Sequence, residues 1–389
     1  MNILFDLYTC QFYCGGAPEY VRRIWYALQE DIATKELNIT LYAMMDCSRN
    51  YSAYKDLTPE QVTKKGITVV DVSKASISDI VHGYKIDTFF LGLAQFCGKL
   101  LRKDEKLNCH TICVVHDLCH EEYYSMHLRD YLRLNNIPRI LARRCVMFFR
   151  KHLHINYELD TMQNIVAVAK NSHNFQFVTV SEYSKNSLSY YFGISPDKVT
   201  VLYSPIRLFD DEECDYTHIC NELEGKQYFL MLSANRENKN PKKLISAFKR
   251  YSELVDNNKY LVTVGYSKSE FDKHIALPFL NPKDLDHVQK KCFALVYPSF
   301  LEGFGYPPVE VMKYSKPILA SNVTSIPEIL GDAPIYFSPF YESDIFKALS
   351  TINDKNYKIY CKKSQERFLR INDKQEQDLR TMIELLENI

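Results

Sequence analysis

Residues 293–332 read FALVYPSFLEGFGYPPVEVMKYSKPILASNVTSIPEILGD, and this stretch decides the fold. The apolar run Phe293–Tyr297 predicts a buried strand that stops at the following proline. A turn containing Gly303 and Gly305 comes next, and two prolines then suit the first turn of a helix to about residue 314. A second strand is predicted at Pro317–Ala320. Strand, turn, helix and strand in this order indicate an α/β domain with a parallel sheet.

The turn has the properties of an anion site. Glycine lets a ligand approach the backbone closely, and the free N–H groups and dipole of a helix start suit an anion. Two carboxylates, Glu302 and Glu310, frame the turn, and an acid beside a phosphate is unfavourable unless it accepts hydrogen bonds from sugar hydroxyls. The pattern therefore favours a ligand that is part phosphate and part polyol, a nucleotide sugar. The alternative is a plain strand–turn–helix with two solvated acids.

This stretch resembles the family 4 retaining glycosyltransferases of the GT-B fold (glycosyl transferases group 1). The matching residues are Glu302, Gly303, Phe304, Gly305, Pro308, Glu310, Met312, Pro317, Ala320, Ser321, Asn322, Pro327 and Glu328. The resemblance implies that Glu302 lies against the donor sugar and Glu310 holds the ribose hydroxyls. It also implies that the amides of Gly303 and Gly305 face the diphosphate, and that Phe304 between them belongs to the donor-binding residues.

A second loop of the same domain carries cations. The strand predicted at Tyr228–Leu232 leads into a loop with Arg236 and Lys239, and a helix is predicted from Pro241 to about Leu254. The resemblance implies that both cations bind the donor diphosphate and neutralise charge on the leaving nucleotide. Lys239 matches the family better, because the two lie closer together than in many members and no glycine precedes Arg236. Ordinary surface charge is the alternative for both.

Two features of the first half also match the family. Gly15 and Gly16 separate a strand predicted at Ile3–Leu7 from a helix, and the resemblance places this diglycine near the donor diphosphate and the acceptor. A simple turn is the alternative. His116 and Asp117 follow an apolar strand directly, and the family often has such a pair with the histidine near the sugar's hydroxyls. The alternative is a histidine that only caps the strand.

Length and composition fit this interpretation. With 389 residues, two domains are expected, and the 48 basic and 48 acidic residues cancel, so nothing draws the chain to nucleic acid. The resemblance implies two Rossmann-like domains facing each other across a cleft: residues 1–207 on the acceptor side and 208–372 on the donor side. It also implies that a helix within 373–389 crosses back onto the first domain.

Cysteine usage and apolar runs bear on location. The twelve cysteines are scattered, and the start of the chain shows no secretory signal, so we expect reduced thiols in a cytoplasmic protein. Apolar runs fall short of the roughly 20 residues that span a bilayer. No acid occurs between Tyr131 and Tyr157, and residues 139–153 mix basic with apolar side chains. This segment is either a half-buried helix with a solvated basic face or a peripheral contact with the inner face of the membrane.

The expected function is transfer of a hexosyl group, with retention, from a nucleotide diphosphate sugar to a glycan or polyprenyl-linked acceptor. Bacterial surface polysaccharide or glycolipid assembly is the family's commonest setting. His116, Lys239 and Glu302 are the expected catalytic residues. No Asp-x-Asp metal motif is apparent at a predicted strand end, no C-x-x-C pair occurs, and Arg236, Lys239 and the helix amino terminus can replace a cation, so we expect neither a metal nor another cofactor. A nucleotide-sugar epimerase or hydrolase, or a non-catalytic scaffold of the same fold, are the alternatives.

Overall fold

The computed structural model describes residues 1–12, 15–49, 52, 54–119, 121–122, 157–207 and 222–387. Within these residues the chain divides into two compact units. The first contains residues 1–122, 157–207 and 374–387, and the second contains residues 222–373. Each unit is built on one parallel sheet, so the predicted class of two Rossmann-like α/β domains is confirmed.

The first sheet has the strand order β3-β2-β1-β4-β5-β6-β7. Its strands are β1 Asn2–Asp6, β2 Thr40–Met45, β3 Thr68–Asp71, β4 Thr88–Leu91, β5 His110–Val115, β6 Phe175–Thr179 and β7 Val199–Val201. All pair in parallel; Phe5 of β1, for example, pairs with Ala43 on one side and Phe90 on the other. These strands are nearly continuous apolar runs because helices cover both faces of a parallel sheet.

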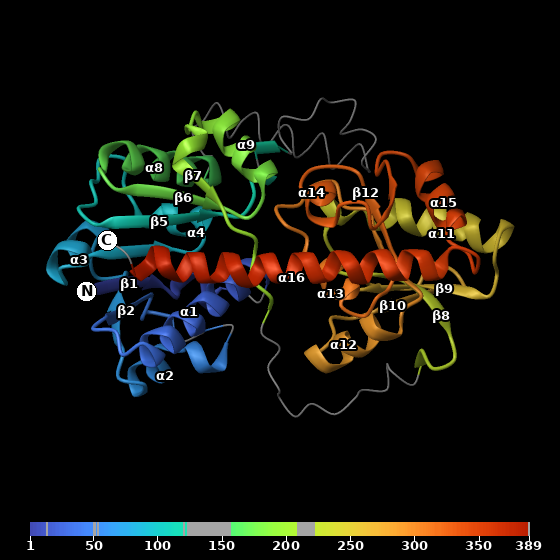
Figure 1. The fold of residues 1–389 in the computed structure, drawn as a ribbon, viewed down its shortest axis with the longest axis horizontal. Coiled ribbons are helices and arrows are strands. Elements are labelled where there is room, and N and C mark those ends of the chain that lie inside the picture. The colour runs from blue at the N-terminus through green and yellow to red at the C-terminus, as the bar shows by residue number, and fades with distance from the viewer. Residues whose placement is uncertain are drawn as a thin grey trace. The chain divides into compact units, whose positions relative to one another are not determined.

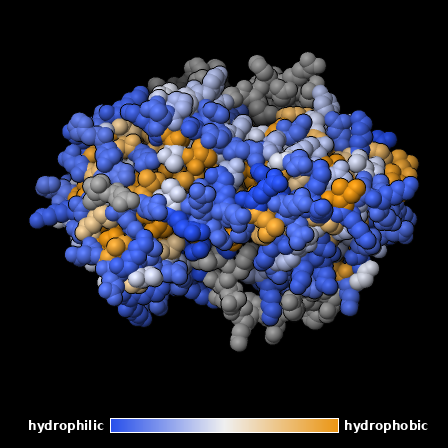
Figure 2. Space-filling view, in the orientation of Figure 1, coloured by the Kyte–Doolittle hydropathy of each residue, from blue (hydrophilic) through white to orange (hydrophobic). Residues whose placement is uncertain are grey.

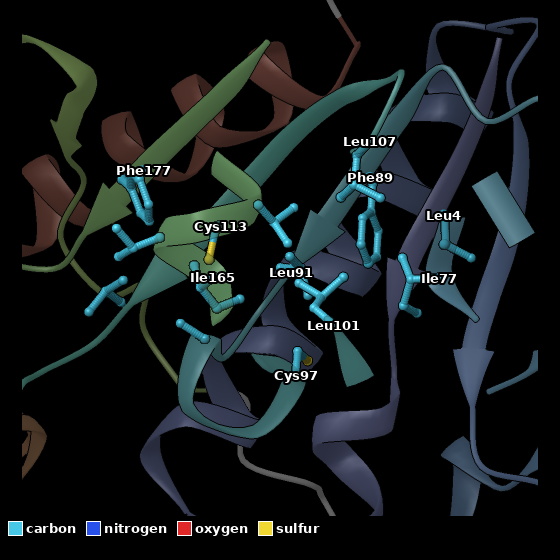
Figure 3. Packing of buried hydrophobic residues seen from close by; sticks show 14 of the residues in the cluster. Leu4, Ile77, Phe89, Leu91, Cys97, Leu101, Leu107, Cys113, Ile165 and Phe177 are labelled. Atoms are coloured by element: carbon cyan, nitrogen blue, oxygen red, sulfur yellow. The ribbon is translucent and has the colours of Figure 1, made fainter. Parts of the chain in front are cut away.

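The helices of this unit present apolar residues at helical spacing. Besides the last helix, the α-helices described in this unit are α1 Gly16–Thr34, α2 Pro59–Lys64, α3 Ile77–Gly83, α4 Ala94–Cys97, α8 Tyr157–Asn171 and α9 Glu182–Phe192. In α1, Val21, Ile24, Trp25 and Leu28 are buried, as their spacing predicts. On the side of the sheet shown in Figure 3, Ile165 of α8 joins strand residues in one hydrophobic cluster. Burial of this face gives the helix most of its stability.

The second sheet has the order β10-β9-β8-β11-β12-β13, again all parallel. Its strands are β8 Gln227–Met231, β9 Lys259–Val264, β10 His274–Leu277, β11 Ala294–Tyr297, β12 Ile318–Ser321 and β13 Ile335–Phe337. Its helices are α11 Pro241–Leu254, α12 Pro282–Lys291, α13 Tyr306–Met312, α14 Ile326–Leu330 and α15 Glu342–Thr351. The strand–turn–helix–strand order predicted for residues 293–320 is therefore present as β11, α13 and β12.

The last helix is longer than the helix expected within residues 373–389. It is one continuous helix, α16 Tyr357–Glu387, of 31 residues (Figure 1). Residues 370–374 contain neither glycine nor proline, so no residue there ends the helix. From Lys374 onward the helix belongs to the first unit, where Asp378 Oδ2 accepts a hydrogen bond of 2.7 Å from the Tyr203 N–H.

The face in Figure 2 is mainly hydrophilic, with hydrophobic residues in small patches. Exposed large hydrophobic residues include Tyr190, Leu254 and Phe279. Among the helices that the structure describes, none combines the length and apolar character needed to cross a bilayer. The basic segment 139–153 lies outside the described residues, so its predicted membrane contact stays a prediction.

Candidate active site

The second sheet reverses its strand order at β8. The chain runs from β8 to β9 on one side, whereas β11 pairs with β8 on the other. In open parallel sheets the loops leaving the carboxyl ends of such strands diverge, and ligands bind in the crevice between them. The predicted site residues lie on these two loops: Arg236 and Lys239 follow β8, and Glu302 to Gly305 follow β11.

Lys239 is held at the end of the first loop. Asn240 has left-handed backbone dihedrals, with φ of 63°. Its side-chain amide, Nδ2, donates to the Pro339 carbonyl at 2.9 Å, and this bond fixes the start of α11. The Lys239 side chain is 8% exposed, and its ammonium forms a short ion pair with Glu302. The ammonium also donates to the Tyr297 hydroxyl at 3.1 Å. A buried cation thus joins the two loops.

The second loop is fixed by backbone contacts. The Phe300 N–H donates to the Asn238 carbonyl at 2.8 Å, which ties this loop to the first. The Glu302 carbonyl accepts from Ser325 Oγ at 2.9 Å, and the Glu302 side chain is 12% exposed. Gly305 has a φ of +94°, which a residue with a side chain adopts only with strain. The predicted need for a glycine is therefore real at this position.

The other predicted donor-binding residues are placed as follows. Glu310, in α13, accepts a hydrogen bond of 3.2 Å from Gln289 Nε2 of α12. Gly303 and Phe304 are buried in the loop before α13. Arg236 is exposed, and among the described residues it takes part in no ion pair. The structure brings Lys239 and Glu302 into contact with each other, and it brings Glu310 into contact with Gln289.

Sequence analysis missed Tyr297, which is the last residue of β11 and is 2% exposed. Its ring lies 5.0 Å from Lys239 Nζ, and its hydroxyl accepts the hydrogen bond described above. The signal was a tyrosine at the carboxyl end of an otherwise aliphatic strand. A buried tyrosine at such a position needs a partner for its hydroxyl.

The first unit has its own switch point between β1 and β4. The diglycine lies on the loop after β1: Gly15 precedes α1, and its carbonyl accepts from the Glu19 N–H at 3.0 Å. His116 follows β5, the next strand along, and Gly92 follows β4. His116 Nε2 lies 3.0 Å from the Gly92 carbonyl. A carbonyl only accepts, so Nε2 carries the proton and Nδ1 is the acceptor of this ring.

The environment keeps His116 neutral. Its side chain is buried against Tyr20, with ring centroids 4.7 Å apart, and burial lowers the pKa of His116 despite the Gly92 carbonyl and nearby Asp117. Asp117 plays a local role, since its Oδ1 accepts from the Cys119 N–H at 3.1 Å. A neutral imidazole with a free acceptor nitrogen suits a hydroxyl donor.

A buried carboxylate that sequence analysis missed supports this loop. Asp6, at the end of β1, is fully buried and accepts hydrogen bonds from the Gly92 N–H at 3.0 Å and Cys97 Sγ at 3.1 Å. The backbone N–H and hydroxyl of Thr9 also donate to it, at 2.9 and 2.7 Å. Burial raises the pKa of Asp6, and these hydrogen bonds oppose the rise. Asp6 thus holds Gly92, the residue whose carbonyl orients His116.

Sequence comparison places the second unit in a known family. Residues 218–352 match the family described as "Glycosyl transferases group 1". This part of the chain is a group 1 glycosyl transferase domain. It contains the Lys239–Glu302 pair, Tyr297 and Glu310. Among the described residues, no group of three or more histidine, cysteine, aspartate or glutamate side chains is arranged to hold a metal ion.

The chain is similar in sequence to two bacterial proteins. Over 184 residues the chain is 26% identical to O-antigen chain mannosyltransferase RfbU of Salmonella typhimurium. The aligned region covers 45% of this chain and 50% of that protein. Over 122 residues it is 33% identical to the serotype-specific mannosyltransferase WbdA of Escherichia coli. That aligned region covers 31% of this chain and 14% of WbdA. The chain thus spans half or less of the length of these relatives.

Solved structures resemble the whole chain. Sucrose-phosphate synthase from Thermosynechococcus elongatus superposes with a TM-score of 0.68 at 13% identity, covering 100% of this chain and 98% of that one. Anabaena HepE in complex with UDP and glucose gives a TM-score of 0.65 at 13% identity and covers 100% of both chains. These likenesses, with the two parallel-sheet domains, show that the chain has the GT-B fold.

Proposed function

We propose that the protein is a glycosyltransferase that moves a hexosyl group from a nucleotide diphosphate sugar to a glycan or polyprenyl-linked acceptor. The observation that carries this proposal is the Lys239–Glu302 ion pair, in which a buried cation and a carboxylate meet at the switch point of the family-matched domain. A diphosphate needs the cation, and the adjoining sugar needs the carboxylate as a hydrogen-bond acceptor.

In the proposed reaction, Lys239 and Arg236 neutralise charge on the departing nucleotide diphosphate, and the amides of Gly303 to Gly305 contact the same group. Glu302 holds hydroxyls of the donor sugar, and Glu310 holds the ribose. His116, with Nδ1 as acceptor, takes a hydrogen bond from a sugar hydroxyl, and the Gly15–Gly16 turn lies near the diphosphate. The assignments of Arg236, His116 and the diglycine rest on the family resemblance.

The chemistry we propose is front-face attack with retention and without a metal. A phosphate oxygen of the departing nucleotide accepts the acceptor's proton as the glycosidic bond breaks and the new one forms. The protein supplies positioning and charge stabilisation. Lys239 supports metal independence, because its buried ammonium already supplies a positive charge where a cation would otherwise act.

We place the reaction in bacterial surface polysaccharide or glycolipid assembly, at the cytoplasmic face of the membrane. The names of the two relatives, both mannosyltransferases and one an O-antigen chain enzyme, support this setting and make GDP-mannose the first donor to test. Peripheral contact through residues 139–153 is tested by co-sedimentation with anionic liposomes at low salt. Failure to co-sediment would remove the membrane part of the proposal.

The experiment is a donor screen followed by product analysis. UDP-, GDP- and ADP-sugars are tested for thermal stabilisation, since a ligand at 100 times its Kd stabilises by about 2.7 kcal/mol. The best donor is then incubated with and without acceptor. Acceptor-dependent release of nucleotide supports transfer, whereas release or epimerisation without acceptor supports the epimerase or hydrolase alternative. If no nucleotide sugar binds, the protein is a scaffold.

A further inference from the structure

The first unit carries a cluster of cations and aromatic rings that the proposed donor site does not use. We define the basic-aromatic cluster as Tyr8, Phe12, Arg49, Phe96 and Lys99. Lys99 Nζ lies 4.4 Å from the centroid of the Phe12 ring, 4.8 Å from that of Tyr8 and 5.7 Å from that of Phe96. The guanidinium carbon of Arg49 lies 4.7 Å from the Phe12 centroid.

The position of the cluster in the sheet is that of a binding site. Tyr8 and Phe12 follow β1, Arg49 follows β2, and Phe96 and Lys99 follow β4. These strands are neighbours in the order β2-β1-β4, so the cluster lies at their carboxyl ends and spans the switch point of the first sheet. Ligands of open parallel sheets bind in the crevice at such a point.

The cluster holds two positive charges close together. Lys99 Nζ and the guanidinium carbon of Arg49 both lie over the ring of Phe12. The two charges are therefore separated by no more than the sum of their distances from the centroid of that ring. Burial lowers the pKa of Lys99, the like charge of Arg49 is the next cause, and Cys97 and Asp46 oppose the shift. Asp46 balances Arg49 at 3.1 Å, but among the described residues no carboxylate lies within 4 Å of Lys99 Nζ. A bound anion would relieve this repulsion.

The loops that carry the cluster are held in place. The buried amide of Gln11 donates to the Asp46 carbonyl at 3.1 Å and accepts from the Asp46 N–H at 2.8 Å, which joins the loops after β1 and β2. The segment after β4 is held as well, because Asp6 at the end of β1 accepts a hydrogen bond from Cys97, two residues before Lys99. Phe12 packs edge-on against both Tyr8 and Phe96. Pre-organised cations lose little entropy on binding an anion.

We propose that the basic-aromatic cluster binds a phosphate group of the acceptor, so that the acceptor is a phosphate ester. Lys99 and Arg49 hold the phosphate oxygens, and the rings of Phe12 and Phe96 pack against the apolar or sugar part beside it. This inference rests on the proposed function, because it assigns the acceptor of that reaction. The phosphate is carried either by a polyprenyl lipid or by a free sugar phosphate.

Isothermal titration calorimetry of the full chain separates these sources. Geranyl diphosphate is the lipid-like probe, glucose 1-phosphate is the free sugar phosphate, and geraniol is the uncharged control. We expect binding of at least one phosphate ester, weaker at high salt, and no binding of geraniol. Preference for geranyl diphosphate assigns a lipid carrier, and preference for glucose 1-phosphate assigns a free sugar phosphate. Failure to bind either ester, or equal binding of geraniol, would overturn the proposal.

Variants tie the binding to the cluster. Lys99→Gln should weaken it about tenfold or more and Arg49→Gln several-fold, since each removes a charge-assisted contact. Lys74→Gln is the matched control, because Lys74 also follows a strand of this sheet but is 79% exposed, and it should bind as the wild type does. Arg49, 51% exposed, can be replaced without disturbing the fold. Wild-type affinity in both cluster variants would refute the site.

The same variants keep this inference separate from the proposed function. Lys99→Gln should leave donor binding unchanged, as measured by thermal stabilisation with the nucleotide sugar found in the screen. A wild-type protein that binds no nucleotide sugar yet binds a phosphate ester through Lys99 would contradict the function and retain the site. A protein that binds a nucleotide sugar but shows no Lys99-dependent binding of a phosphate ester would support the proposed function and refute the phosphate site.

Discussion

Lys239 and Glu302, 63 residues apart in the chain, form an ion pair that joins the loops leaving β8 and β11. The two side chains are only 8% and 12% exposed. Removing one partner of a buried pair leaves the other charge uncompensated. This contact therefore has consequences for stability as well as for donor binding.

For turnover, Lys239→Ala should lower kcat at least a hundredfold with every donor accepted, because the lost ammonium acts on the diphosphate that all donors share. Lys242→Ala, an exposed lysine of α11, is the matched control and should keep wild-type rates. Steady-state kinetics with two or more donors makes the comparison. Unchanged rates in Lys239→Ala would remove this residue from the site.

For stability, Lys239→Met and Glu302→Leu should each lower the free energy of unfolding by about 3–5 kcal/mol. The double variant should lose less than the sum, with a coupling of about 1–3 kcal/mol. Urea unfolding followed by far-UV circular dichroism measures all four proteins of the cycle. Strict additivity would mean that the two side chains do not interact in solution.

Glu310→Ala should weaken nucleotide-sugar binding about tenfold, because the proposed ribose contact is a charge-assisted hydrogen bond worth about 1.5–3 kcal/mol. Glu253→Ala removes an exposed carboxylate from α11 and serves as the control. Titration calorimetry with the donor and with its free nucleotide gives both affinities. Since the ribose is in both ligands, a loss confined to the intact donor would contradict the assignment.

Gly98→Ala should destabilise the first unit by about 1–3 kcal/mol. A Cβ at this position would lie 2.3 Å from the Thr161 carbonyl oxygen of α8, so backbone must move. Gly83→Ala is the control: its Cβ meets nothing within 4 Å, and it should be neutral or stabilising by up to about 1 kcal/mol. Fluorescence of Trp25, the single tryptophan and a buried residue of this unit, follows unfolding in guanidinium.

His274 should make the second unit less stable as the pH falls from about 6.5 to 4. Burial lowers the pKa of His274 to about 4, and Glu270 opposes the shift. Its Nδ1 accepts from the Glu270 N–H at 3.0 Å, a bond that protonation would abolish. The unfolded state therefore binds more protons than the folded state across this range, and stability rises with pH.

His274→Gln should flatten this slope, whereas His82→Gln, which replaces an exposed histidine, should retain it. Urea midpoints from circular dichroism at several pH values make the comparison. A wild-type ring signal for His274 that titrates near pH 6.5 in NMR spectra would contradict the prediction.

Most of the fold was predictable because local physics specifies it. Apolar runs ending at polar or glycine-containing turns predicted β1, β5, β8, β11 and β12, and α11 begins and ends where its pattern predicts. Local residue type also sets helix starts: Asn281 and Ser181 precede α12 and α9, and the side chain of each accepts a backbone N–H three residues on. The edge strand β10, His274–Leu277, was not predicted, because only Ile275 and Leu277 in it are strongly apolar and a proline follows it directly.

By itself, the sequence determined which loops carry the candidate chemistry, since glycines, acids and cations cluster between predicted strands and helices. Only the tertiary structure decided which of them meet. It paired Lys239 with Glu302 and Tyr297, gave Glu310 to Gln289, and buried Asp6 beside the loop that orients His116. The physical reason is that strand order, which spacing along the chain does not encode, sets which loops lie side by side.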